Sequence, residues 1–153
     1  MMKKILFVCH GNICRSPMAE FVMKHLVREA GLSDEIIIAS KALHRDEIGS
    51  DTHRGTRDVL RVHGIPFTKR SASLMTAADY DAYDCIIGMD TENMRDLARL
   101  TGGDPEGKVR RLLSYIGEER DVADPWYTGN FDATYRDVDA GCRALLRTLT
   151  KSE

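Results

Sequence analysis

Short apolar runs alternate with longer stretches of helical periodicity along this chain. Residues 4–8, 35–39, 84–89 and 109–113 have the length and the β-branched content of buried strands. Helical spacing of apolar positions predicts helices over 17–30, 51–63, 90–100 and 135–149. Strands that alternate with helices form parallel sheets covered on both faces. We therefore predict an α/β fold, a single doubly wound domain whose central four-stranded parallel sheet is flanked by helices.

The first strand and the first helix are separated by a short loop with clear boundary signals. Pro17 suits the first turn of a helix, where its missing N–H costs little, and Ser16 is a candidate N-cap. Gly31 is expected to end this helix. In doubly wound folds ligands bind beyond the carboxyl ends of the strands, which is where this loop must lie.

Composition limits the class of protein. The 153 residues are 42% hydrophobic and 30% charged with a formal net charge of -2, which fits one domain over residues 1–153 and does not favour nucleic-acid binding. The N-terminal apolar run is too short for a secretory signal, and the chain has no apolar stretch of membrane-spanning length. We expect a cytoplasmic protein that does not bind membranes.

The cysteine pattern argues against both disulfides and metal. Without a secretion signal, the four cysteines are expected to be reduced thiols. The sequence contains no Cys-x2-Cys pair and no His-x3-His cluster, so we predict no metal site and no cofactor. Cys85 and Cys142 lie in apolar stretches and should be core residues. His44, His53 and His63 form no evident pair and are expected on the surface or in the core.

The loop carries the chemical signal. Cys9 and Arg15, separated by five residues, stand between a strand and a helix N-terminus. Backbone N–H groups and the helix dipole at such a junction bind a phosphate dianion, and an arginine fork can grip two of its oxygens. The same positive field favours a thiolate at Cys9, to which Ser16 can donate its hydroxyl. The loop predicts a cysteine nucleophile beside bound phosphate.

The motif Cys-His-Gly-Asn-Ile-Cys-Arg-Ser-Pro-Met-Ala-Glu, residues 9–20, resembles the signature of low-molecular-weight protein tyrosine phosphatases, and the similarity continues in order along nearly the whole chain. The resemblance implies hydrolysis of phosphotyrosine through a phosphocysteine on Cys9, with Arg15 as the phosphate clamp. The implied phosphate-binding loop consists of His10, Gly11, Asn12, Ile13, Cys14 and Arg15.

A second motif, Asp124-Pro125-Trp126-Tyr127, precedes the last predicted helix. A phenol leaves poorly as an anion and needs a proton from an acid. Asp124 resembles the family's general acid, which then acts as base for the attacking water. The resemblance places Trp126 and Tyr127 with Ile13 on the wall of the substrate cleft, where rings and apolar groups would hold a phenyl ring.

The resemblance also implies supporting roles. Asn12 should adopt a left-handed conformation and tie the loop to Ser40 after the second strand. Cys14 is either a reversible redox partner of Cys9 or a small buried thiol. Asp90, at a junction between strand and helix, is expected to be structural.

Two positions depart from the family pattern. Asp46 stands where many members carry a cleft tryptophan, so one wall is expected to be more open. A family histidine that helps to fix the loop asparagine is replaced near Lys69 or Arg70. Because of these departures, the sequence does not predict which side chain forms that cleft wall or which one fixes the loop asparagine.

Three other functions share parts of this pattern. Phosphoarginine phosphatases of the same fold typically have Thr where this chain has Ile13, so an aryl ester is favoured. Arsenate reductases need further paired cysteines near the third strand, where only Cys85 occurs. A non-catalytic phosphate-binding module would not need Cys9 and Asp124 together. The expected partners are phosphotyrosine proteins or small aryl phosphates, with inorganic phosphate as product and inhibitor.

Overall fold

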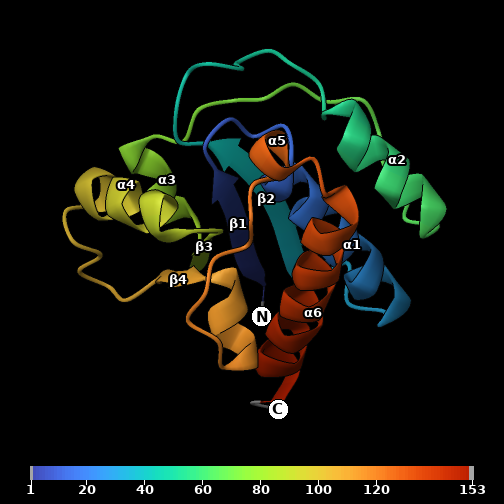
Figure 1. The fold of residues 1–153 in the computed structure, drawn as a ribbon. Helices are drawn as coiled ribbons and strands as arrows, with labels where there is room; N and C mark the ends of the chain where they lie inside the picture. The colour runs from blue at the N-terminus through green and yellow to red at the C-terminus, as the bar shows by residue number, and fades with distance from the viewer. Residues whose placement is uncertain (1, 152–153) are drawn as a thin grey trace.

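The computed structural model describes residues 2–151 and contains one parallel sheet among them (Figure 1). Its strands are β1 (Lys3–Cys9), β2 (Ile36–Ala42), β3 (Cys85–Gly88) and β4 (Val109–Arg111), in the spatial order β2-β1-β3-β4. Every neighbouring pair is parallel. The predicted four-stranded sheet and its strands are confirmed, although β4 is shorter than predicted.

The helices connect these strands and follow the last one. They are α1 (Arg15–Glu29), α2 (Arg54–Val62), α3 (Ala77–Ala82), α4 (Thr91–Thr101), the 3-10 helix η1 (Leu112–Ile116), α5 (Pro125–Thr128) and α6 (Phe131–Lys151). The four predicted helices are present as α1, α2, α4 and α6, with ends shifted by a few residues. Helices α3, α5 and η1 were not predicted from the sequence.

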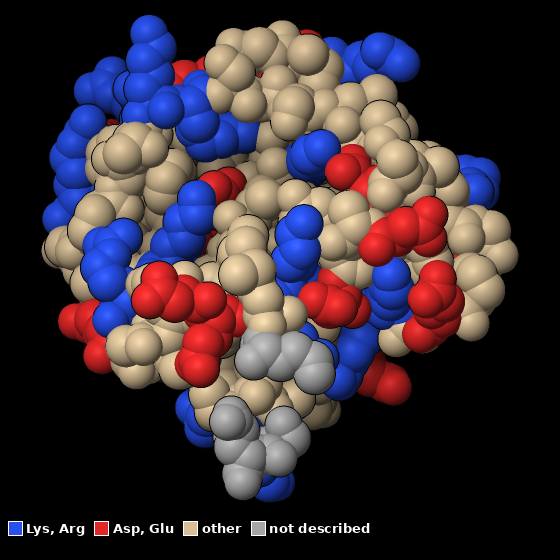
Figure 2. Space-filling model, turned by 180° about the vertical axis from the view of Figure 1, so that it is seen from behind, with Lys and Arg blue, Asp and Glu red and all other residues tan. Residues whose placement is uncertain are grey.

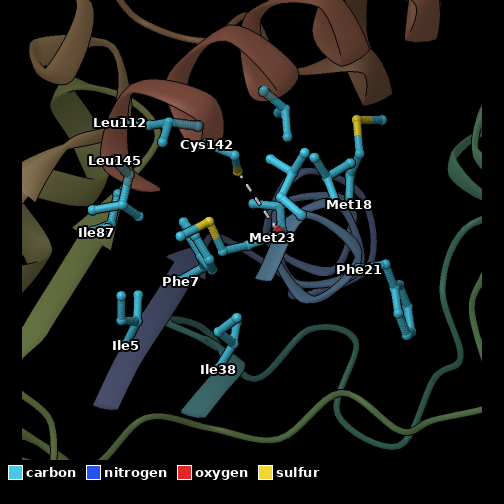
Figure 3. Packing of buried hydrophobic residues seen from close by; sticks show 14 of the residues in the cluster. Ile5, Phe7, Met18, Phe21, Met23, Ile38, Ile87, Leu112, Cys142 and Leu145 are labelled. Atoms are coloured by element: carbon cyan, nitrogen blue, oxygen red, sulfur yellow. Dashed lines mark hydrogen bonds between the residues drawn. The ribbon is translucent and has the colours of Figure 1, made fainter. Parts of the chain in front are cut away.

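Side chains of β1 alternate between two apolar layers, as the two-residue period of a strand requires. Ile5 and Phe7 belong to a large buried cluster with residues of α1 and α6, whereas Leu6 and Val8 pack with residues of α3 and α4 on the other face. Figure 3 shows side chains from β1, α1 and α6, among them Phe7, Met23 and Leu145, within the larger cluster. Helices therefore cover both faces, and the doubly wound architecture is confirmed.

The two cysteines outside the loop pack as predicted. Cys142 is fully buried in the larger cluster, where its Sγ lies 3.7 Å from the backbone oxygen of Ala19 (Figure 3). Burial raises the pKa of Cys142 far above the ordinary thiol value. Cys85 is half-buried and packs against the same cluster. Burial also raises the pKa of the Cys85 thiol. Neither thiol is suited to a redox relay.

Charged side chains of both signs are interleaved over much of the face shown in Figure 2. This mixture agrees with the small net charge of the sequence. Within residues 2–151, no helix has both the length and the apolar content needed to cross a membrane.

Candidate active site

A cleft of about 340 Å³ lies at the carboxyl ends of β1 and β3, within the size range of small-molecule sites. It brings together Cys9, Arg15 and Asp124, although Arg15 and Asp124 are 109 residues apart in the chain. The predicted cleft residues Ile13, Asp46, Trp126 and Tyr127 also line it. The remaining lining residues are His10, Gly11, Cys14, Glu47, Asp90, Glu92 and Asn93.

The loop between β1 and α1 enters the helix earlier than predicted. Helix α1 begins at Arg15, so Ser16 lies inside its first turn and the prediction that Ser16 is the N-cap is wrong. Cys14 precedes the helix, and no side chain caps its first amide groups. The first N–H groups of a helix lack intrahelical partners, so those of α1 can bind an anion.

Ser16 supports the nucleophile from within the helix. It is fully buried, and its Oγ lies 3.1 Å from Cys9 Sγ. Asn12 Nδ2 donates to the same hydroxyl oxygen at 2.8 Å. Because an amide nitrogen only donates, the Ser16 hydroxyl accepts from Asn12 and keeps its own proton for the sulfur. This arrangement can stabilise a thiolate on Cys9.

Asn12 fixes the shape of the loop. Its φ of 60° is left-handed, as predicted, and its Nδ2 also donates to Ser40 Oγ at 3.0 Å. Ser40 in turn donates to Glu20 at 2.5 Å. Arg70 donates to Asn12 Oδ1 in a short hydrogen bond. Arg70, one of the two residues near which the family histidine is predicted to be replaced, therefore supports the asparagine.

Arg15 is almost fully buried, with 2% exposure, and three groups hold its side chain in place. Its Nη1 donates to Asp90 at 2.7 Å and to the Val122 backbone oxygen at 2.8 Å, and its Nη2 reaches Asp124 at 3.3 Å. Burial opposes the guanidinium charge, but the nearby Cys9, Asp124 and Asp90 outweigh it and raise the pKa of Arg15. The arginine is thus charged and oriented before it meets phosphate.

Asp124 lies at the N-terminus of α5. Its Oδ1 accepts from the Trp126 backbone N–H at 3.0 Å, and Pro125 occupies the first turn. The segment before it is tied to the sheet, because Val122 N–H donates to the Met89 oxygen at 2.9 Å. The carboxyl group is therefore directed into the cleft on a short, well-defined turn.

The rim of the cleft is more exposed than its base. Trp126 and Tyr127 are 60% and 84% exposed, and Trp126 meets His53 edge to face. Asp46 Oδ2 is 2.7 Å from His10 Nε2. Partial burial opposes protonation of His10, but Asp46 and Glu92 outweigh it and raise the pKa of this imidazole above its ordinary value.

Cys14 is buried on the loop and packs with Ile13 and Ala72. Burial, reinforced by the negative charge at Cys9, raises the pKa of Cys14 to about 12. The two loop cysteines therefore differ in surroundings: Cys9 faces a hydroxyl donor at the cleft, and Cys14 is a protonated thiol beneath it.

Several residues of the site have contacts that were not predicted from the sequence. Asp90 was predicted to be structural, and it does cap α4 by accepting from Asn93 N–H at 2.7 Å, but it also orients Arg15. His44 is not isolated, because its ring stacks on His10 with centroids 4.1 Å apart. Glu92 joins them on the rim. No local motif could reveal these pairings, since they depend on the sheet order.

Comparison with known proteins identifies the class. Residues 4–153 match the family model described as low molecular weight phosphotyrosine protein phosphatase. The chain belongs to this family, and it is a protein-tyrosine-phosphatase, a phosphoric monoester hydrolase.

Among similar proteins, the low molecular weight protein-tyrosine-phosphatase YfkJ of Bacillus subtilis is 39% identical, with 99% of each chain covered. The crystal structure of YfkJ superposes with a TM-score of 0.96 over 100% of this chain and 98% of that one. SP-PTP of Streptococcus pyogenes is also 39% identical, with a TM-score of 0.88 over 97% and 94% of the chains. A structure titled drosophila arginine phosphatase, DARP, is 30% identical, with a TM-score of 0.88 over 96% and 98%.

Proposed function

We propose that residues 1–153 form one phosphatase domain that hydrolyses phosphotyrosine through a phosphocysteine on Cys9. The observation that carries this proposal is the single cleft in which Cys9, Arg15 and Asp124 meet. A nucleophile beside a phosphate-binding helix terminus, a fixed guanidinium and a carboxylic acid are the groups that two-step phosphoryl transfer needs.

In the first step, the Cys9 thiolate attacks phosphorus and the P–O bond to the phenol breaks. Asp124 gives its proton to the departing phenol oxygen, while Arg15 and the loop N–H groups bind the equatorial oxygens. In the second step, water attacks phosphorus, Asp124 takes a proton from the water, and the S–P bond breaks. Thiolate and inorganic phosphate result, and Ser16 can donate to the sulfur as it leaves.

The covalent step is tested by Cys9→Ser. A serine hydroxyl is not ionised by the loop, so we expect at least a roughly 10⁴-fold loss of kcat on p-nitrophenyl phosphate. Phosphate binding, followed by calorimetry, should survive, because the amides and Arg15 remain. A Cys9→Ser enzyme that still turned over p-nitrophenyl phosphate at a substantial rate would refute the covalent mechanism.

Phosphoarginine is the second candidate substrate, because a relative of similar fold is titled an arginine phosphatase. Ile13 favours phosphotyrosine in this chain. Its side chain is buried to 8% exposure, lines the cleft and offers a phenyl ring an apolar contact without a hydroxyl for a guanidinium. We expect kcat/KM to be higher on a phosphotyrosine peptide than on the matched phosphoarginine peptide.

The discriminating variant is Ile13→Thr, measured on both peptides. It should narrow the ratio of the two kcat/KM values by about 10-fold, since one apolar contact is worth about 1–3 kcal/mol in substrate discrimination. A wild-type preference for phosphoarginine would reverse the assignment.

We also propose that the enzyme works in a reducing, cytoplasmic compartment on phosphotyrosine proteins or small aryl phosphates, with phosphate as product and inhibitor. All four cysteines are free, and a nucleophilic thiol such as Cys9 persists only where oxidants are scarce. Mixed surface charge supports the expectation that neither nucleic acid nor a membrane is a partner.

A further inference from the structure

Two histidines meet at the mouth of the cleft in a fixed arrangement. His10 follows β1 and His44 follows β2, and the His44 backbone N–H donates to the His10 oxygen at 2.9 Å. Their rings stack with centroids 4.1 Å apart and an angle of 17° between the planes. The backbone therefore holds two imidazoles side by side before any ligand arrives.

A carboxylate completes a group of three possible ligands. One oxygen of Glu92, at the start of α4, lies 3.5 Å from His10 Nδ1. One ligand atom from each of His10, His44 and Glu92 lies within 4.8 Å of the other two. A metal lies in the plane of each imidazole that binds it, so the two rings would have to turn out of their nearly parallel stack to bring these atoms to the roughly 2.0–2.2 Å at which zinc binds nitrogen and oxygen.

The Nε2 atom of each imidazole faces its own carboxylate, which leaves Nδ1 as the nitrogen that would bind a metal. His10 Nε2 lies 2.7 Å from Asp46, and His44 Nε2 lies 2.8 Å from Asp96. Histidines that bind metal generally donate their other ring N–H to a carboxylate or carbonyl, which fixes the tautomer and makes the ligand nitrogen more basic. Both histidines satisfy this pattern, which an exposed acidic cluster alone would not provide.

Charge favours a cation at the same place. The carboxylates Asp46, Glu92 and Asp96 lie around the two rings, although Asp96 is also paired with Arg99. Two imidazoles and one carboxylate suit zinc-like cations, whereas calcium and magnesium prefer oxygen ligands.

We propose that His10, His44 and Glu92 bind a divalent cation of the zinc class at the mouth of the catalytic cleft. Asp46 and Asp96 orient the histidines, and water fills the open coordination position. The cation would join the loop after β1, the segment after β2 and the start of α4. This site does not depend on the proposed reaction at Cys9, so it is tested in an enzyme that lacks that thiol.

The test is calorimetric titration of the full-length Cys9→Ser protein with ZnCl₂, together with the visible spectrum of the Co²⁺ form. The Cys9→Ser background removes the competing thiolate, and Cys14 remains a buried, protonated thiol. We expect one equivalent bound with micromolar affinity, nitrogen and oxygen ligation in the Co²⁺ spectrum, and a rise in Tm that EDTA reverses.

Variants locate the site. His44→Gln should weaken zinc binding at least about 100-fold, and Asp96→Asn should weaken it about 10–100-fold, as loss of an orienting carboxylate typically does. His63→Gln, which changes a histidine stacked on Tyr135 on another part of the surface, should bind zinc like its parent. Circular dichroism verifies that each variant is folded.

Failure is equally well defined. If the folded Cys9→Ser protein binds no zinc at millimolar concentration, or if His44→Gln binds as tightly as its parent, the proposal is wrong. Loss of binding in His63→Gln but not in His44→Gln would place the metal elsewhere and also overturn it.

Discussion

The base and the rim of the cleft are built differently. In the base, Asn12 and Ser16 are fully buried and Arg15 is 2% exposed, and each makes two or more side-chain hydrogen bonds. On the rim, Trp126 is 60% and Tyr127 84% exposed. A crowded, hydrogen-bonded base keeps the reacting groups aligned, whereas an exposed rim can change without disturbing them. We therefore infer that the base determines which reaction occurs, and that the rim determines which substrates enter the cleft.

Apart from loss of the nucleophile itself, the largest expected effect comes from changing the arginine clamp in the base. Arg15→Lys keeps a positive charge but removes the fork that contacts Asp90, Val122 and Asp124. We predict about a 10³-fold fall in kcat, since losing a fixed transition-state donor costs about 10²–10³. Steady-state kinetics on a phosphotyrosine peptide checks this. A decrease in kcat of less than 10-fold would show that the clamp is dispensable.

A smaller effect is expected one layer below the reacting groups. Arg70→Met removes the main donor to Asn12 Oδ1 and leaves that buried oxygen only the Ser73 backbone N–H, at 3.4 Å. We predict about 1–3 kcal/mol less unfolding free energy and about a 10-fold lower kcat. Urea denaturation and kinetics measure both, with Arg147→Met, an exposed change on α6, as the matched control. Equal behaviour of the two variants would remove Arg70 from the support of the loop.

The smallest effect should come from the rim. Asp46→Asn weakens the contact with His10 at the rim, so kcat should change by less than about 3-fold. KM and the pH dependence of stability should change instead. Because the folded pKa of His10 is raised above 6.5, its pairing stabilises the protein fully below that pH, and the stability is lost as pH rises through the folded pKa.

The Asp46→Asn protein should therefore show a flatter decline of Tm than the wild type as the pH rises above 6.5. Asp34→Asn, an exposed substitution just before β2, at the end of the sheet opposite the cleft, serves as the control. An unchanged pH profile in Asp46→Asn would mean that the ion pair contributes nothing to folding.

The elements that depend on neighbouring residues could be predicted from the sequence. A short apolar run followed by helical periodicity predicts the strand that ends at Cys9 and the helix after it. In the loop between them, the spacing of five residues between Cys9 and Arg15 indicates phosphate chemistry. Helix α3 has only six residues and no apolar periodicity; its signal was the capping box of Thr76 and Asp79. The short helix α5 could not be predicted, because the Asp-Pro pair at its start is equally typical of a turn.

Contacts across the sheet were beyond such patterns. Asp90 meets Arg15 across 75 residues, and Arg70 meets Asn12 across 58, because the strand order folds distant segments onto one edge. The sequence indicates that a family histidine is replaced near Lys69 or Arg70, but only the fold shows that the Arg70 side chain reaches Asn12. The Ser16 cap was misplaced because Arg15 already has helical geometry.

The phosphoenzyme itself provides the most direct test of the central claim. Asp124→Ala should accumulate it from p-nitrophenyl phosphate, because this phenol leaves without much help while the attack of water loses its base. Rapid acid quench and peptide mass spectrometry should find near-stoichiometric phosphate on Cys9. Phosphate on another residue, or no phosphoenzyme in a variant that still turns over by a single displacement, would contradict the account.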